Sequence, residues 1–295
     1  MAYSFRASDN SVEQGLCRIA ISQLESGLEE LCDDSMARSA KVHAARKRCK
    51  KMRGLVRFVR CSFDDYSGEN KIFRDAARTL SDARDATALL ATADALETHF
   101  SKELKKAALN PLRDRLETKK AALDDDEIES RLADMVAVFE NALERVKDWS
   151  LGETGPDAFT GGVAKTYDRA RKAMAKARKT GKADDFHAWR KRVKYHRYHA
   201  RLAKRIWRPV LDGRVEEADA LSDDLGDHHD LAVLTTAAKE ALGPDAETAE
   251  LVEGLARARQ AQIEASCFER GEKLFSEKGA ALAERWEGWW RAGFQ

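Results

Sequence analysis

The 295-residue chain carries 52 Lys and Arg against 51 Asp and Glu, a net charge of +1, and 43% of its residues are hydrophobic. Its five cysteines form no C-x-x-C pair and are odd in number, which argues against a disulfide scaffold and suits a reducing cytoplasm. The N-terminus lacks a signal-peptide core, and no apolar run approaches the ~18 residues of a membrane span. We therefore expect a soluble cytoplasmic protein.

The sequence predicts helices throughout. Only four prolines occur, all where helices start or stop, and alternating β-branched runs are absent, which together indicate an all-α fold. In chain order we expect helices at 11–33, 38–61, 68–81, 83–99, 102–122, 125–149, 157–180, 184–208, 212–225, 229–242, 246–275 and 277–291. Asn110-Pro111 has the form of a helix start, and Gly243-Pro244-Asp245 that of a helix end followed by the next cap.

Two of these helices repeat one pattern, H-x-x-R-K-R-x-K-x-x-R-x-x-x-R. The repeat predicts two related halves of ordinary size, which we place at 1–150 and 151–295 with residues 152–156 as the linker. The shared positions are His43, Arg46, Lys47, Arg48, Lys50, Arg53 and Arg57 in the first copy, and His187, Arg190, Lys191, Arg192, Lys194, Arg197 and Arg201 in the second.

Both copies lie in windows that contain no acid. Residues 41–60 and 186–208 hold nine Lys and Arg each, so 34 basic residues face 51 acidic ones in the rest of the chain. At 100° per residue each helix has a basic side opposite an apolar one. The basic sides are His43, Arg46, Lys47, Lys50, Arg53 and Arg57, and His187, Arg190, Lys191, Lys194, Tyr198 and Arg201. The apolar sides are Val42, Ala45, Cys49, Met52, Val56 and Val59, and Trp189, Val193, Ala200 and Ala203. Arg48 and Arg192 lie off the basic sides, and we interpret them as ordinary surface residues.

The missing acids point to an anionic partner. A Lys/Arg side of a helix is most often a solvated surface, but solvated surfaces normally interleave acids four residues before Lys. Cations ~6 Å apart on adjacent turns repel by ~0.7 kcal/mol in water and ~3 kcal/mol at an effective dielectric of ~20. A bound polyanion, gripped by Arg and Lys, would supply the missing counter-charge.

A weaker repeat follows each basic helix. LSDARDATALL at 80–90 matches LGDHHDLAVLT at 225–235, which aligns Arg84 with His229. One helix before Arg84, Arg74 and Arg78 are spaced i, i+4 and therefore share a face. The two halves thus agree in order as well as in one motif.

The segment DLGDHHD at 224–230 allows two interpretations. His228, His229 and Asp230 resemble the His-Asp pair of a metal phosphohydrolase, whereas Asp227 suits a helix cap. We prefer the cap, because the H-E-x-x-H, E-x-x-H and P-loop patterns are all absent.

Together these segments resemble the CHAD domain, a helical domain named for its histidines. The similarity spans nearly the whole chain, with VHAARKRCKKMR and LSDARDATALL in the first half and GGVAKTYDRARKA, FHAWRKRVKYHRY and LGDHHDLAVL in the second. The resemblance implies two similar four-helix bundles related by an approximate two-fold axis around a basic central groove or pore. It implies binding of inorganic polyphosphate, as at polyphosphate granules, with no catalytic residue, metal or cofactor. The E-x-E-x-K signature of the hydrolase domain that accompanies many relatives is absent, so we expect the stand-alone form.

The resemblance also implies binding positions. They are His43, Arg46, Lys50, Arg53, Arg84, Lys165, Tyr167, Arg171, His187, Arg190, Lys191, Lys194 and Tyr198. Arg197 stands where the family pattern has an aromatic residue, and His229 where it has an arginine. With the remaining basic positions, Lys47, Arg57, Arg74, Arg78, Arg197, Arg201 and His229 complete the predicted site.

The alternative is a helical nucleic-acid-binding protein, because Lys/Arg helices also neutralise DNA and RNA backbones. The few aromatic residues do not interleave with the basic sides as stacking platforms would. Trp286, Trp289 and Trp290, at i, i+3, i+4, are interpreted as a helix docking on its core.

Overall fold

The chain folds into helices over the residues that the structure describes. The computed structural model describes residues 3–80, 82–104, 106–121, 125–243 and 246–293, without the side chains of 82–87, 106–107, 119–121 and 125. The elements are α1 Val12–Cys32, α2 Arg38–Phe58, α3 Tyr66–Thr79, α4 Asp82–His99, the 3-10 helix η1 Lys106–Leu109, α5 Asn110–Ala121, α6 Asp125–Val146, α7 Asp157–Thr180, α8 Ala183–Ala203, α9 Arg208–Leu242, α10 Glu247–Leu274 and α11 Gly279–Gly293. The predicted all-α class is confirmed for this part of the chain.

Most predicted bounds agree with these helices to within a few residues, and one prediction is wrong. Residues 212–225 and 229–242 are parts of the single helix α9, so Asp227 lies inside a helix and caps nothing. Leu225, His228 and Leu231 are buried on both sides of the expected break, and their packing keeps the helix continuous through Gly226. The cap predicted at Asp245 lies outside the described residues.

Other departures are smaller. The second basic helix, α8, ends at Ala203 instead of residue 208, and α9 follows with Pro209 in its first turn. The helix predicted from residue 102 becomes η1 and then α5, which begins at Asn110 as the Asn110-Pro111 pair predicts. Gly243 ends α9 with a φ of 96°, a conformation that favours glycine.

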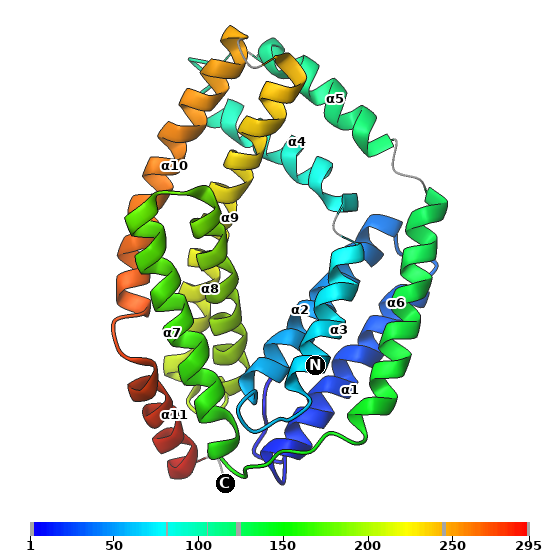
Figure 1. Cartoon of the computed structure of the whole chain (residues 1–295), viewed down its shortest axis with the longest axis vertical. Coiled ribbons are helices and arrows are strands. Elements are labelled where there is room, and N and C mark those ends of the chain that lie inside the picture. Colours follow the sequence, from blue (N-terminus) through cyan, green and yellow to red (C-terminus); the bar gives the residue numbers. More distant parts are fainter. Residues whose placement is uncertain (1–2, 81, 105, 122–124, 244–245, 294–295) are drawn as a thin grey trace.

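The helices pack in two groups around a central space (Figure 1). One group contains α1, α2, α3 and α6, and the other α7, α8, α9 and α10, with α11 docked on α7. Helices α4 and α5 pack on α9, so they join the first half of the chain to the second. The groups also meet where α2 packs against α7 and α8. The approximate two-fold relation between the halves stays a prediction.

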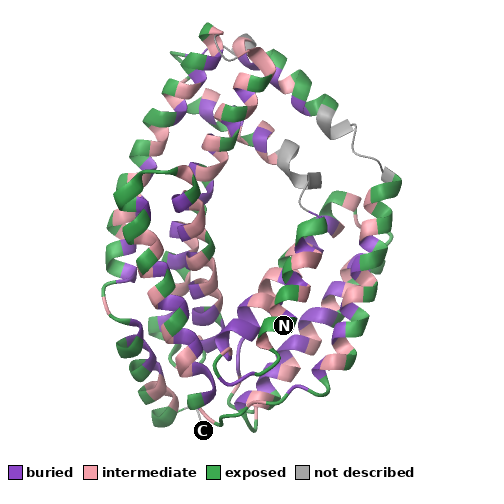
Figure 2. Ribbon diagram, viewed as in Figure 1, coloured by how far each residue is buried: buried purple, intermediate pink, exposed green. Residues whose placement is uncertain are grey.

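One continuous core runs through both halves. Buried residues gather where α2 meets the second group (Figure 2), and there the rings of Phe5 and Phe58 stack at 5.4 Å and those of Phe58 and Phe159 at 4.8 Å. Such aromatic contacts favour one fixed arrangement of the two groups. In α11, Trp286 is fully buried, which confirms that this helix docks on the core.

The linker between the halves is held in place. Gly152 N donates a hydrogen bond to Ser62 O at 2.8 Å, and Leu151 N donates to Glu13 Oε2 at 2.8 Å. Among the described residues, no helix is both long and apolar enough to span a membrane.

Candidate functional site

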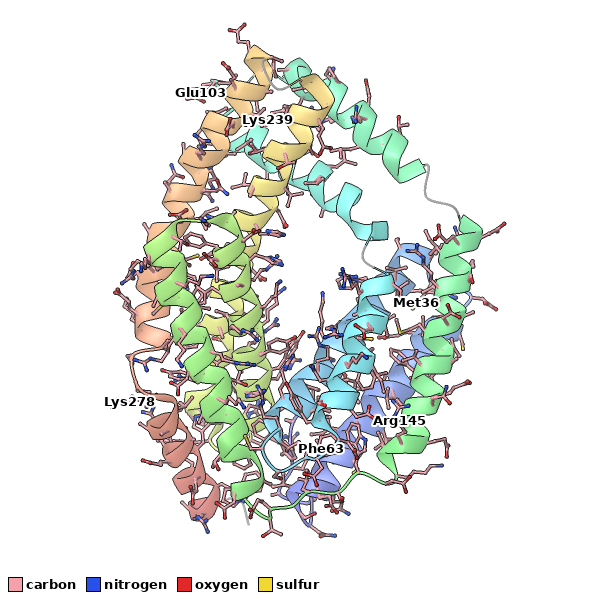
Figure 3. All side chains as sticks on the ribbon, viewed as in Figure 1. Met36, Phe63, Glu103, Arg145, Lys239 and Lys278 are labelled. Carbon is pink, nitrogen blue, oxygen red and sulfur yellow. The ribbon has the colours of Figure 1, made fainter. Side chains whose placement is uncertain are left out.

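The basic sides of α2 and α8 lie outside the core, as predicted, except that Arg57 is buried. Every residue of the predicted apolar sides is buried, whereas His43, Lys47 and Lys191 are exposed. Nitrogen-bearing side chains of α2, α3, α8 and α9 project into the central space (Figure 3). We call the following set the inner basic surface: His43, Arg46, Lys47, Lys50, Arg53, Arg74, Arg78, His187, Arg190, Lys191, Lys194 and His229.

Helix α3 receives two arginines of α2. Arg46 Nη1 donates to the carbonyl of Ala77 at 2.6 Å, near the C-terminal end of α3, where the helix dipole favours a cation. Arg53 Nε donates to Asn70 Oδ1 at 3.4 Å. These contacts fix both guanidiniums at the α2–α3 boundary.

The predicted pair Arg74 and Arg78 lies exposed on α3. Arg74 forms an ion pair with the adjacent Asp75 at 2.8 Å. It also lies close to Arg53: burial lowers the pKa of Arg53, and the positive charges of Arg57 and Arg74 lower it further. Arg74 of α3 therefore adds its positive charge to that of the α2 arginines.

Two predicted histidines lie against each other at the α8–α9 boundary. The ring centroids of His187 and His229 are 3.9 Å apart, with 30° between the planes. Burial, followed by His229 and the cations Lys191 and Arg190, lowers the pKa of His187 to about 3. His187 is therefore neutral near pH 7, and an anion bound beside it would raise its pKa.

Gly226 creates the space for Arg190. A Cβ atom at Gly226 would lie 2.3 Å from Arg190 Nη2 and 2.7 Å from Arg190 Cζ, so the guanidinium rests directly on the α9 backbone. The sequence analysis missed this role, although a glycine inside a helix next to a repeated motif is a usable signal.

The basic sides of α2 and α8 approach each other where the helices cross. Gly54 of α2 faces Tyr198, because a Cβ there would meet the tyrosine Cβ at 2.8 Å. The guanidinium carbons of Arg53 and Arg57 lie 5.7 and 4.3 Å from the ring centroid of Tyr195 on α8. Cations of the first half therefore lie against the second half, and Tyr195, which the sequence analysis did not select, joins them.

Two residues of the predicted site lie elsewhere. Tyr167 is fully buried and donates a hydrogen bond to Leu274 O at 3.1 Å, so a ligand cannot reach it and we remove it from the site. Arg171 Nε donates to Phe275 O at 3.2 Å, toward the segment between α10 and α11. Both predictions came from the family resemblance, and in this chain both residues hold α7 to its C-terminal neighbours.

The remaining predicted residues take several positions. Arg197 forms an ion pair with Asp219 at 2.7 Å, so it already has a counter-charge and does not need one from a ligand. Lys165 and Arg201 are exposed, on α7 and α8 respectively. Burial raises the pKa of Tyr198 to about 12, in keeping with its packing at the α2–α8 crossing. The side chain of Arg84 lies outside the described residues.

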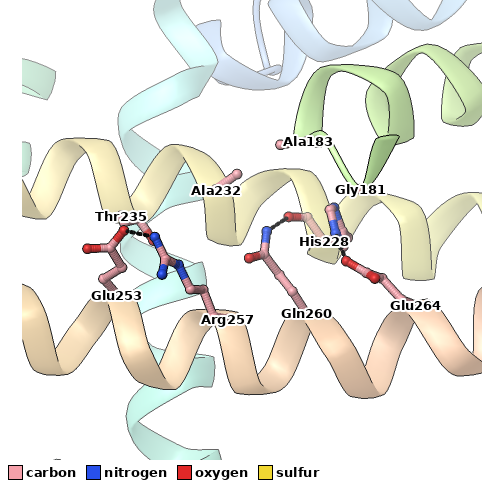
Figure 4. A pocket seen from close by; sticks show the side chains of 9 residues that line it. All are labelled: Gly181, Ala183, His228, Ala232, Thr235, Glu253, Arg257, Gln260 and Glu264. Carbon is pink, nitrogen blue, oxygen red and sulfur yellow. Dashed lines mark hydrogen bonds and ion pairs between the residues drawn. The ribbon is translucent and has the colours of Figure 1, made fainter. Parts of the chain in front are cut away.

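His228 and His229 point to different sides of α9. His228 is buried, and its Nε2 lies 2.9 Å from Glu264 Oε1, beside a pocket of about 180 Å³ whose lining residues include Gln260 (Figure 4). His229 stacks on His187 at the inner basic surface. The described residues contain no group of three or more His, Cys, Asp or Glu that could hold a metal ion. The segment 224–230 thus does not bring its two histidines together.

Comparison with known proteins identifies relatives. Residues 17–239 match the family model of the CHAD domain. The chain resembles the structure of PptA from Streptomyces chartreusis, with 18% identity, a TM-score of 0.59, and coverage of 89% of this chain and 98% of that one. It also resembles the CHAD domain from the plant Ricinus communis, with 15% identity, a TM-score of 0.57, and coverage of 92% and 93%. No curated protein sequence matches significantly. At these identities the structural likeness concerns the fold alone.

Proposed function

This chain belongs to the CHAD domain family, and on that premise we propose that it binds inorganic polyphosphate without transforming it. The inner basic surface is the proposed binding site, as a groove between the two halves. The proposal includes the approximate two-fold relation of the halves and a cytoplasmic location at polyphosphate granules.

The observation that carries the proposal is the convergence of two acid-free basic helix sides. Gly54 of α2 packs against Tyr198 on the basic side of α8, and the Arg53 guanidinium lies 5.7 Å from the ring centroid of Tyr195 on the same helix. Two cations that lie close together repel each other by ~3 kcal/mol at an effective dielectric of ~20. A negative charge has to offset this repulsion, and the windows 41–60 and 186–208 contain no acidic residue. A linear polyanion with one negative charge on each internal phosphate supplies that counter-charge along the whole surface.

Nucleic acid is the competing ligand. Its recognition as a single strand depends on aromatic platforms for the bases. The aromatic side chains beside the arginines of α2 include Tyr195 and Tyr66, whose rings Arg53 and Arg57 already cover. In α11, Trp286 is in the core and the ring of Trp289 packs edge-on against that of Trp207. These positions favour a phosphate polymer without bases.

A competition experiment tests the proposal. Labelled polyphosphate is bound to the protein, and unlabelled polyphosphate of graded length, duplex DNA and RNA compete at equal phosphate concentration. We expect polyphosphate to displace the label at lower concentration than either nucleic acid. Equal or better displacement by DNA or RNA would replace our proposal with the nucleic-acid reading, and release of phosphate during the assay would show that the protein is an enzyme.

A further inference from the structure

Four arginines gather where α2, α3, α7 and α8 meet, beyond the set that defines the inner basic surface. We call Arg57, Arg60, Arg169 and Arg192 the Arg57 cluster. Burial lowers the pKa of Arg192, and the positive charges of Arg169, Arg57 and Arg60 lower it further, so all three act on Arg192. The sequence predicted an ordinary surface residue at Arg192, and in the structure this residue is half-buried among positive charges.

Two tyrosines hold the cluster in place. Arg57 Nη1 donates to the hydroxyl of Tyr66 at 2.5 Å, and the Arg57 guanidinium lies 4.3 Å from the ring centroid of Tyr195. The Arg60 guanidinium lies 4.7 Å from the ring centroid of Tyr66. Stacking on aromatic rings fixes the planar donor forks at little entropic cost when an anion arrives.

The repeat makes the charge imbalance clear, because Arg48 and Arg192 occupy the same position of the motif. Arg48 binds Glu30 through Nε and Nη2, at 2.9 and 2.6 Å. Arg192 has no ion pair with any carboxylate among the described residues, and neither have Arg57, Arg60 and Arg169. An acid neutralises this position in one half, whereas arginines surround it in the other.

Burial makes the imbalance costly. Arg57 is only 7% exposed, and its Nε is buried without a hydrogen-bond partner within the described part of the chain. A buried guanidinium without a counter-ion is strongly unfavourable, and an anion bound beside the cluster would supply the missing negative charge. Arg169 on α7 is exposed, whereas Arg60 and Arg192 are half-buried, so an anion would approach the cluster from the side of Arg169.

We propose that the Arg57 cluster is a separate site for a doubly charged terminal phosphate group, as found at the end of a phosphate chain and in pyrophosphate. Internal phosphates of a linear chain carry one charge each, whereas a terminal group carries close to two above neutral pH. Arg57 and Arg60 both lie against Tyr66, and Arg169 and Arg192 add two further positive charges. This concentration of charge matches a compact dianion better than one internal phosphate of a chain. Only the attachment of this group to a longer polymer rests on the proposed function, since pyrophosphate carries the same group.

The test compares ligands that differ only in their ends. Three ligands are titrated into the full chain by calorimetry. They are pyrophosphate, a short polyphosphate of defined length, and the same polyphosphate with both terminal phosphates blocked as phosphoramidates of an uncharged amine. Blocking the ends should weaken binding of the short chain about tenfold, the loss expected for one charge-assisted hydrogen bond. Equal affinity for blocked and unblocked chains would overturn the proposal.

Variants separate this site from the groove. Arg192→Gln should weaken pyrophosphate binding about tenfold and abolish the difference between blocked and unblocked chains. Arg48→Gln removes the same charge at the same motif position and should leave that difference intact; thermal unfolding checks that both variants fold. An Arg192→Gln protein that binds pyrophosphate like the wild type would refute the site. If long, end-blocked chains fail to bind the wild type while Arg192 still matters for pyrophosphate, the groove proposal fails and the Arg57 cluster stands.

Discussion

Gly226→Ala should separate stability from binding. The new Cβ would lie 2.3 Å from Arg190 Nη2, so the guanidinium has to move by ~1 Å to reach an ordinary contact distance. The end of an arginine side chain moves easily, and alanine inside a helix is favoured over glycine by ~1 kcal/mol. We therefore expect a protein at least as stable as the wild type whose Arg190 no longer points where it did. Loss of one hydrogen bond to a charged group costs ~1.5 to 3 kcal/mol, about ten- to hundredfold in affinity.

Gly213→Ala is the matched control for this prediction. Gly213 lies in the same helix, α9, and a Cβ there would have no atom within 4 Å. Both variants should gain helix propensity, but only Gly226→Ala should lose polyphosphate affinity. Thermal unfolding and competition binding at fixed ionic strength measure the two effects. Polyphosphate affinities that are the same in the two variants would refute the reasoning that Gly226 positions Arg190 for the ligand.

Further predictions concern charge and pH. Lys50→Glu and Lys194→Glu should each weaken polyphosphate binding strongly, since the two lysines lie in different halves of one proposed groove. An unchanged affinity in either variant would contradict a shared groove. Lys273→Glu, at an exposed position of α10, is the control. Affinity should fall steeply with salt, as for nucleic acid strands, which lose ~0.7 to 0.9 log units of affinity per neutralised phosphate per log unit of salt. A flat dependence in titrations would indicate a few buried hydrogen bonds instead. Because the pKa of His187 is about 3, its protonation on binding should raise the polyphosphate affinity only below pH 6.5, the ordinary pKa of histidine. Proton uptake on binding at pH 7.5 that is abolished by His187→Gln would disprove this. Burial also lowers the pKa of His199 to about 3. The contribution of neutral His199 to the free energy of unfolding is therefore full above pH 6.5 and is lost as the pH falls toward 3, by ~2 kcal/mol at pH 5. Urea unfolding midpoints that stay constant from pH 7 to 5 would contradict this prediction.

The sequence alone determined the features that depend on spacing within one helix. The positions of Val42, Ala45 and Cys49 opposite His43 and Lys47 follow from 100° per residue, and the structure buries the first three and exposes the other two. The all-α class and most helix bounds follow from the same local information, as does the family resemblance, which rests on the order of short segments.

Local signals failed where distant residues compete with them. Gly226 and Asp227 have the composition of a helix boundary, yet α9 runs through them because residues on both sides pack into the core. Tyr167 lies within a family segment, but its burial depends on how closely the residues after α10 pack against α7.

Only the tertiary structure decided which cations lack a partner. Arg48 and Arg192 are equivalent in the repeated motif, and nothing in their own helices distinguishes them. Glu30 comes to Arg48 from α1, whereas the neighbours of Arg192 are arginines of α2 and α7. The charge balance around a side chain is set by helices far away in the sequence, because electrostatic interactions depend on distance in space and on burial.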